Sequence, residues 1–252
     1  MTTAILSALA EEQAGLIELL EAPEKVRHAG RDFWCGRLYE RPVVLALSRI
    51  GKVSAATTAT ALIERFDVQR VLFTGVAGGL AGQVKVGDLV IATGFVQHDL
   101  DVSPLFPRFE VPSYDRDRFD CDEPLTAILS GAVKDLCTRA IGQFDSEIGV
   151  LRPVLHAGLL ASGDRFVSSA IESSALQAAL RSAGHEALAV EMEGAAVAQV
   201  CFDYRVPLAA VRTISDRADD LAHLDFPRFV RDIASRFARE IVQRFLQALP
   251  AP

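Results

Sequence analysis

The sequence predicts an α/β fold in which one sheet, largely parallel or mixed, is covered by helices on both faces. Short apolar runs alternate with segments of helical period along most of the 252 residues, and this order is typical of sheets flanked by helices. The run at 70–74 is apolar without alternation, as expected of a strand buried on both faces. Neither an internal repeat nor a linker interrupts the chain, so we expect residues 1–252 to form a single domain.

The expected elements follow one another regularly. We expect strands at residues 5–9, 32–38, 43–47, 70–74, 89–97, 155–161, 188–191 and 208–214. Helices are expected at 11–20, 54–66, 125–141, 173–183, 195–204 and 228–249. The turn at 39–42 makes a hairpin of the strands on either side of it.

Residues 99–122 break this pattern. The segment holds three prolines, three phenylalanines and many charged residues. A long loop without secondary structure is usually either functional or disordered. The aromatic content favours an ordered lid near the active site, or an interface, over a flexible linker.

Composition argues against several classes of protein. A formal net charge of −7 disfavours a nucleic-acid partner, because binding to phosphates needs a basic surface. No run approaches the ~20 apolar residues of a membrane span, and the apolar start at 3–10 lacks the positive charge of a signal peptide. The cysteines have no zinc-site spacing, and reduced thiols are the simplest interpretation. We therefore expect a cytoplasmic protein without a membrane, nucleic-acid or metal partner.

Four segments place carboxylates or glycines where predicted strands end, which is where open α/β folds bind ligands. They are residues 8–12, 74–80, 190–196 and 211–216. Locally, Glu12 is explained more simply as an acidic residue in a first helical turn, and the glycines after Thr74 fit a tight turn as well as a ligand site. Glu193 follows an apolar strand, where a carboxylate is costly to bury without a partner, and it indicates function. Arg212 and Asp216 fit either a buried ion pair or a site.

These segments also carry a family resemblance. In order along the chain they are ALAEE at 8–12, SRIGKVSAA at 48–56, TGVAGGL at 74–80, VKVGDLVIA at 84–92, QHDLDV at 97–102, SGDRFV at 162–167, VEMEGAA at 190–196 and RTISDRAD at 212–219. With them the chain resembles the nucleoside phosphorylase/hydrolase superfamily, and most closely the 5′-methylthioadenosine/S-adenosylhomocysteine nucleosidases. The resemblance implies a single three-layer α/β domain with a central twisted mixed β-sheet flanked by helices, which works as a homodimer on a small nucleoside substrate.

The resemblance also implies roles for individual residues. Glu12 is similar to the base that activates the attacking water, Glu193 to the carboxylate that holds the ribose hydroxyls, and Asp216 to the acid that protonates N7 of the departing purine. The implied substrate-binding residues are Val76, Ala77, Gly78, Phe166, Val167, Glu191, Met192, Arg212, Ser215 and Phe226. From a partner subunit we expect Ile50, Val102 and Phe106. No metal or organic cofactor is implied.

The chemistry of the bond agrees with these roles. Cleavage of an N-glycosidic bond passes through an oxocarbenium-like sugar, so a carboxylate beside the ring stabilises charge present mainly in the transition state. The base leaves only after protonation, and the nucleophile needs a base on the opposite face, as in inverting glycosidases. Because an aspartate has a pKa of ~3.9 in water, Asp216 is expected to lie where burial or hydrogen bonding raises its proton affinity.

Water is preferred over phosphate as the nucleophile. Hexameric bacterial phosphorylases of the superfamily place an arginine on the strand before the glycine segment, where this chain has Phe73. Glu12 would also repel a phosphate dianion. Two departures from the nucleosidase pattern remain open: Val76 stands where a serine is expected, and Arg49 could supply a phosphate contact in a partner's site.

Two alternatives stay open beside the nucleosidase. One is a phosphorylase, or a nucleosidase for another 5′-substituted adenosine such as a futalosine-type substrate, since the loop at 99–122 shapes the 5′ side. The other is a non-catalytic nucleoside-binding or storage protein. Degenerate members of that kind lose catalytic carboxylates, whereas all three candidates are present here.

Overall fold

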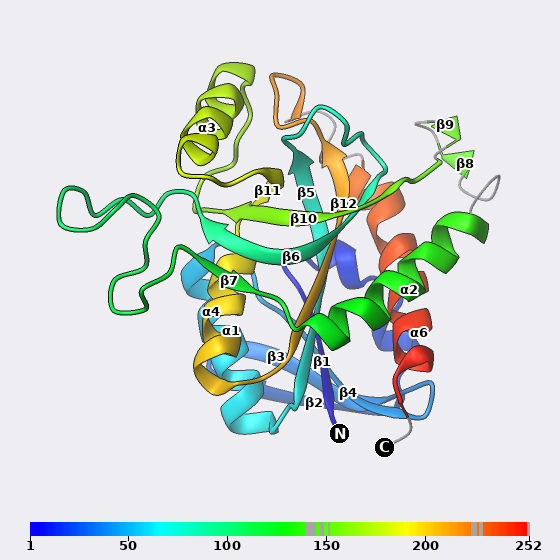
Figure 1. Ribbon diagram of the computed structural model, residues 1–252. Coiled ribbons are helices and arrows are strands. Elements are labelled where there is room, and N and C mark those ends of the chain that lie inside the picture. The colour runs from blue at the N-terminus through cyan, green and yellow to red at the C-terminus, as the bar shows by residue number, and fades with distance from the viewer. Residues whose placement is uncertain (140–144, 147–148, 151, 223–225, 227–228, 251–252) are drawn as a thin grey trace.

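One large mixed sheet organises the molecule (Figure 1). The computed structural model describes residues 1–139, 145–146, 149–150, 152–222, 226 and 229–250. Within these residues ten strands share a sheet, in the order β11-β10-β6-β12-β5-β1-β4-β3-β2, with β7 beside β6. The strands are β1 (Thr3–Ser7), β2 (Glu21–His28), β3 (Arg31–Leu38), β4 (Arg41–Leu47), β5 (Arg70–Gly79), β6 (Leu89–Gln97), β7 (Arg118–Asp120), β10 (Leu155–Ser162), β11 (Ala187–Glu191) and β12 (Leu208–Asp216). A separate pair joins β8 (Asp145–Ser146) to β9 (Gly149–Val150).

Helices cover both faces of this sheet. On one side α1 (Lys52–Phe66) packs on α4 (Gly194–Tyr204), and on the other α2 (Glu123–Arg139) packs on α6 (Ser235–Ala248); α3 (Ala170–Ser182) lies near β10 and β11 (Figure 1). Strand β1 illustrates that the sheet is buried on both faces. Ala4 and Leu6 belong to one apolar core, and Ile5 between them belongs to the other. The predicted α/β fold class, a mixed sheet flanked by helices, is confirmed.

The sheet closes on itself at one end, which was not predicted. Strand β11 is parallel to β10 and also runs antiparallel to β5, where Ala189 pairs with Gly79 and Val190 with Gly78. Because β5, β12, β6 and β10 are neighbours in turn, these five strands form a ring. Side chains from β5, β11 and β12 that are distant in sequence are thereby brought together.

Most expected elements occur, with three corrections. The helix predicted at 11–20 is wrong: the segment forms two 3₁₀ turns, η1 (Glu11–Gln13) and η2 (Ile17–Leu19), separated by Gly15 at φ 83°, which no continuous helix contains. Strand β2 was not predicted. The strand predicted at 70–74 runs five residues further, to Gly79.

The C-terminal helix also differs from the prediction. A π-helical turn, η3 (Val230–Ala234), precedes α6. The predicted start of this helix, at 228, lies outside the described residues. So does residue 141, the predicted end of the helix expected at 125–141.

The loop at 99–122 projects from the body of the molecule (Figure 1). Two of its phenylalanines, Phe109 and Phe119, are buried, and the second belongs to the short strand β7. Phe119 packs edge-on against Tyr114, with ring centroids 5.5 Å apart. This burial agrees with the expectation of an ordered segment.

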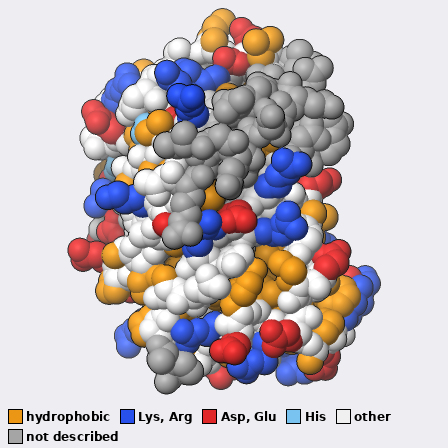
Figure 2. Space-filling model, turned by 90° about the vertical axis from the view of Figure 1, so that its right-hand side faces the viewer, with side chains coloured by type: hydrophobic (Ala, Val, Ile, Leu, Met, Phe, Trp, Pro, Cys, Tyr) orange, Lys and Arg blue, Asp and Glu red, His pale blue; other side chains and the backbone are white. Residues whose placement is uncertain are grey.

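On the surface that Figure 2 shows, charged side chains of both signs are interspersed over the side that carries α2 and α6. Of the helices in the described ranges, none is long and apolar enough to cross a membrane. Cys35, Cys121, Cys137 and Cys201 are free thiols.

Candidate active site

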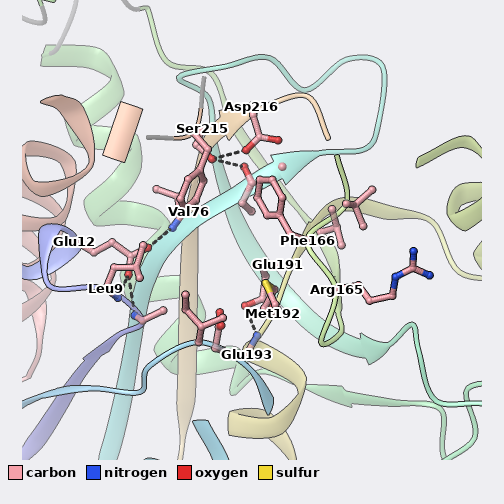
Figure 3. Close-up of a pocket in the computed structure, with 17 residues that line it drawn as sticks. Leu9, Glu12, Val76, Arg165, Phe166, Glu191, Met192, Glu193, Ser215 and Asp216 are labelled. Carbon is pink, nitrogen blue, oxygen red and sulfur yellow. Dashed lines mark hydrogen bonds between the residues drawn. The ribbon is translucent and has the colours of Figure 1, made fainter. Parts of the chain in front are cut away.

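A cavity of about 290 Å³ opens where β1, β5, β11 and β12 end (Figure 3). Strand ends are the expected ligand site of such sheets. Its walls are mainly apolar, and its polar groups come from separate elements. The lining residues are Ala8, Leu9, Glu12, Ile50, Val76, Ala77, Gly78, Arg165, Phe166, Val167, Val190, Glu191, Met192, Glu193, Ser215, Asp216 and Phe226.

This cavity contains most of the residues singled out in the sequence. All three expected catalytic carboxylates line it, as do the expected substrate-binding residues except Arg212. Ile50 lines the cavity of its own chain, so its expected origin in a partner subunit is not needed. Val102 and Phe106 lie in the projecting loop and do not line it.

Sequence reasoning missed two prominent lining residues. Leu9 lies in the turn after β1, three positions before Glu12, and Arg165 lies beside Phe166 in the SGDRFV segment. Each lies in the same short motif as a residue that was identified. The local signal was therefore available, but it did not say which neighbours turn inward.

Glu12 is held at the base of the cavity with only 2% of its surface exposed. One carboxylate oxygen accepts hydrogen bonds from the backbone N–H groups of Ala8 and Leu9, at 2.8 and 2.9 Å, and the other from Val76 at 3.0 Å. Burial raises the pKa of Glu12, and these amides together with the charge of Arg212 oppose the increase. Gly75 allows the approach, since a Cβ there would lie 3.0 Å from Glu12 Oε1. The result is a fixed, poorly solvated carboxyl group suited to accepting a proton.

Arg212 is buried behind the cavity rather than exposed to it. Its guanidinium donates to Glu191 at 2.8 Å and to the Phe73 carbonyl oxygen at 3.2 Å, and it stacks over the Phe73 ring at 4.0 Å from the centroid. The ring of Phe73 thus supports the charge of Arg212.

Glu191 has most of its hydrogen-bonding capacity satisfied by the protein. Besides Arg212, its carboxylate accepts from the backbone N–H of Gly194, at 2.9 Å from either oxygen, and from the Ser162 hydroxyl. The carboxylate therefore satisfies the first turn of α4, where helix N–H groups lack partners of their own. This geometry makes Glu191 chiefly a support for its neighbour Glu193.

Glu193 lies at the start of α4 and faces the cavity (Figure 3). Its Oε1 accepts a hydrogen bond from the backbone N–H of Gly51 at 2.8 Å. Burial and the nearby charge of Glu191 raise the pKa of Glu193 to about 8. A carboxyl group in this environment gains from hydrogen-bond donors such as sugar hydroxyls.

Asp216 stands at the opposite end of the cavity, at the end of β12 (Figure 3). The Ser215 hydroxyl donates to one of its oxygens at 2.8 Å and the Ala218 N–H to the other at 2.8 Å. A Cβ on Gly78 would come within 2.8 Å of Asp216 Oδ1, so a glycine is needed at this point of β5. The carboxyl group is fixed in orientation, as an acid aimed at one ligand atom must be.

Phe166 and Phe226 form an aromatic wall beside Asp216. Their ring centroids are 5.6 Å apart in an edge-on arrangement. Phe166 remains 45% exposed, so much of its ring is available to a planar ligand.

The cavity offers little to a phosphate dianion. Arg165 is the one cationic side chain among the described residues that line it, and it is paired with Glu172 at 2.7 Å. Arg49 donates to the Gly30 carbonyl oxygen outside the cavity. Across the described ranges, no group of three or more His, Cys, Asp or Glu side chains is arranged to hold a metal ion.

Comparison with known proteins identifies the family. The model of the phosphorylase superfamily matches residues 2–247. The chain belongs to this superfamily. It is 35% identical to the aminodeoxyfutalosine nucleosidase of Helicobacter pylori over 237 residues, which cover 93% of this chain and 94% of that protein. It is also 35% identical to the 5′-methylthioadenosine/S-adenosylhomocysteine nucleosidase of Bacillus thuringiensis over 250 residues, or 99% of this chain and 100% of the relative.

Solved structures of the superfamily agree with this assignment. The nucleosidase of Neisseria meningitidis, in complex with methylthio-immucillin-A, superposes with a TM-score of 0.86 at 32% identity, covering 98% of this chain and 99% of that one. The resemblance found in the sequence is confirmed, and the chain is a hydrolase of N-ribosyl bonds within the phosphorylase superfamily.

Proposed function

We propose that this protein hydrolyses the N-glycosidic bond of 5′-substituted adenine nucleosides, with 5′-methylthioadenosine and S-adenosylhomocysteine as substrates. The observation that carries the proposal is the placement of Glu12, Glu193 and Asp216, from three separate elements, around one cavity (Figure 3). Three carboxyl groups that face one cavity from different sides match the needs of acid, base and sugar-binding group.

The reaction follows from this placement. Glu12 accepts a proton from the water that attacks C1′, and the C1′–N9 bond breaks as the new C–O bond forms. Glu193 binds the ribose hydroxyls, whose donated hydrogen bonds favour its ionised form. The carboxylate then stabilises the positive charge that develops on the sugar. Asp216 donates a proton to N7, so adenine leaves as a neutral base and the sugar keeps the hydroxyl from water. No cofactor has a part in these steps.

The remaining lining residues fit the parts of such a substrate. We assign Phe166 to stacking on the adenine, the Val167 backbone to its edge, and Met192 to the underside of the sugar. Val76, Ala77, Gly78 and Ser215 border the base and the ribose, with Glu191 and Arg212 behind them. The 5′ side is formed by Leu9, Ile50 and Phe226, apolar side chains that suit a thioether.

A larger 5′ substituent is the second candidate. The Helicobacter pylori relative is named for aminodeoxyfutalosine, and Ile50 at the edge of this cavity is 57% exposed. A bulky group could extend past such a side chain towards solvent. Adenine release should therefore be compared among 5′-methylthioadenosine, S-adenosylhomocysteine, adenosine and aminodeoxyfutalosine.

The same assay tests the nucleophile. Each substrate is incubated with and without phosphate, and the sugar product is analysed as free ribose or ribose 1-phosphate derivative. Release of adenine without phosphate supports the proposal. Release that requires phosphate would show that water is not the nucleophile, and no release from any of these nucleosides would contradict the substrate class.

We also propose that the whole chain acts as one domain, in a homodimer in the cytoplasm. The projecting loop presents Leu105, 79% exposed, next to Phe106. Val102 and Phe106 would approach the 5′ side of a partner's cavity. The free thiols fit a reducing compartment. Analytical ultracentrifugation of the wild type and of Phe106→Ser tests the dimer, which the polar residue should weaken.

A further inference from the structure

The mouth of the cavity is formed by two segments whose large side chains lack strong apolar support. Ile50 precedes α1, and Phe166 follows β10; both line the cavity and both are substantially exposed. Apolar packing alone therefore does not fix their positions. A set of polar contacts just behind the mouth joins the two segments instead.

Three side chains make these contacts in a closed arrangement. Asp164 Oδ1 accepts the backbone N–H of Lys52 at 2.7 Å, and the backbone N–H of Asp164 donates to Asp99 Oδ2 at 2.8 Å. Lys52 Nζ completes the triangle with an ion pair to Asp99 Oδ1 at 2.6 Å and also donates to Gln97 at 3.0 Å. The segments after β4, β6 and β10 are thereby tied together (Figure 1).

The position of Asp164 at the start of α1 gives this contact its strength. Gly51 caps α1 without a side chain of its own, and the carboxylate of Asp164 takes the place of a capping group for the Lys52 N–H. A Cβ on Gly51 would lie 3.0 Å from Asp164 Oδ1, so the glycine permits the approach. Burial raises the pKa of Asp99, but the hydrogen bonds from Lys52 and Asp164 outweigh this effect. The pKa of Asp99 is therefore lowered overall, which favours the ionised form.

The same helix start also reaches Glu193. The Gly51 N–H donates to Glu193 Oε1, and the next residue, Lys52, donates to Asp164. Any shift of residues 50–52 therefore moves Ile50 at the mouth and the hydrogen-bond donor of Glu193 together. Asp164 is thus linked, through residues 51 and 52, to Glu193 in the cavity.

We propose that Lys52, Asp99 and Asp164 form a positioning network that sets the geometry of the cavity mouth and, through Gly51, the orientation of Glu193. None of these three residues lines the cavity. It holds Ile50 and Phe166 on either side of the bound nucleoside, and this role rests on the proposed function.

Substitution of Asp164 separates the network from a general loss of stability. In Asp164→Ala the Lys52 N–H loses its acceptor, and we expect KM to rise and kcat to fall by about tenfold each. Asp164→Asn keeps an oxygen at this place and should restore both constants to within about threefold of wild type. The matched control is Arg244→Met, which breaks the partly buried contact of Arg244 with Asp135 between α2 and α6; neither of these two residues lines the cavity.

The ion pair of Lys52 and Asp99 allows a second, independent test. Lys52→Met and Asp99→Asn should each raise KM, and the double variant should be no worse than the poorer single one, because the two side chains act as a unit. Hydrogen exchange should show faster exchange of residues 50–53 and 163–166 in these variants and in Asp164→Ala, and no change there in Arg244→Met.

The outcomes keep this proposal apart from the proposed function. Unchanged KM and kcat in Asp164→Ala, or the same changes in Arg244→Met, would overturn the network. Wild-type protein that releases no adenine would overturn the proposed function alone. In that case hydrogen exchange and the affinity for adenine by calorimetry still test the network, since neither needs turnover. Unchanged exchange in Asp164→Ala would refute it.

Discussion

The backbone N–H of Val76 donates to Oε1 of Glu12 at 3.0 Å, although the two residues are 64 positions apart. This bond ties the middle of β5 to the turn that follows β1, two neighbouring parallel strands. It presents a buried carboxylate, with two further backbone donors on its other oxygen, to one wall of the cavity. The first predictions follow from this relationship.

Replacement of Glu12 tests the proposed base. Glu12→Gln keeps the size of the side chain and removes its capacity to accept a proton at neutral pH, so we expect kcat to fall by about 10³-fold. Adenine release by chromatography measures the effect, and circular dichroism verifies the fold. Glu11→Gln is the matched control, since Glu11 is exposed and should tolerate the change. If Glu12→Gln keeps turnover within about threefold of wild type, Glu12 is not the base of the reaction.

Gly75 offers a way to disturb Glu12 without changing it. A methyl group at Gly75 would lie 3.0 Å from Glu12 Oε1, whereas one at Gly82 meets nothing within 4 Å. We expect Gly75→Ala to displace the carboxylate and to lower kcat by at least about tenfold, and Gly82→Ala to leave kcat unchanged. If both variants have wild-type kcat, the position of the Glu12 carboxylate is not critical.

The proposed acid can be tested by changing the leaving group. Asp216→Asn cannot protonate N7, and we expect adenine release to fall by about 10²-fold or more. A nucleoside methylated at N7 already carries the positive charge that the proton would supply, and it should be cleaved by Asp216→Asn at nearly the wild-type rate. An equal loss on both substrates would show that Asp216 does not act as the acid.

Glu193 predicts a specific dependence of stability on pH. Its pKa is raised from 4.5 to about 8 in the folded protein, so between these values the folded state binds more protons than the unfolded state. The contribution to stability is complete below about pH 4.5 and is lost as pH rises to about 8, with a slope of at most about 1.4 kcal/mol per pH unit.

Urea unfolding at several pH values measures this dependence. Glu193→Gln cannot titrate, and the free energy of unfolding of wild type relative to this variant should fall steadily from pH 5 to pH 8. The raised pKa of Glu12 changes stability with pH in the same direction. Because Glu12 is present in both proteins, its contribution cancels in the comparison. A difference that is constant across the window would contradict the raised pKa of Glu193.

The buried pair of Arg212 and Glu191 gives a prediction about stability. The two side chains are each only 2% exposed and lie 2.8 Å apart. Arg212→Met leaves a buried carboxylate without its partner, which should destabilise the fold by about 3–5 kcal/mol. Adding Glu191→Gln should recover part of this loss in urea unfolding. If the double variant is less stable than Arg212→Met, the Glu191 charge does not need Arg212.

The sequence identified much of the site because the signals were local. Carboxylates that follow apolar strands, as Glu193 and Asp216 do, are costly unless a site or a partner receives them. The family motifs also contain most of the other lining residues, from Val76 to Ser215. Leu9 and Arg165 were missed because neighbours in sequence share a segment, and only the path of the backbone decides which of them faces the cavity.

Errors in the fold had equally physical causes. The segment at 11–20 has helical periodicity, but Gly15 adopts a positive φ and the chain continues at once into β2. That strand is exposed, charged and contains Pro23, features common on the edge of a sheet and hard to distinguish from a loop.

The sequence by itself determined the α/β class, the family and which carboxylates line the cavity, because apolar periodicity and motif order are properties of consecutive residues. The tertiary structure alone decided the closure of β11 onto β5, the burial of Arg212 behind Glu191, and the contacts of Lys52 with Asp99 and Asp164. Each of these joins segments far apart in the chain. Their pairing depends on how whole elements pack, which no local pattern encodes.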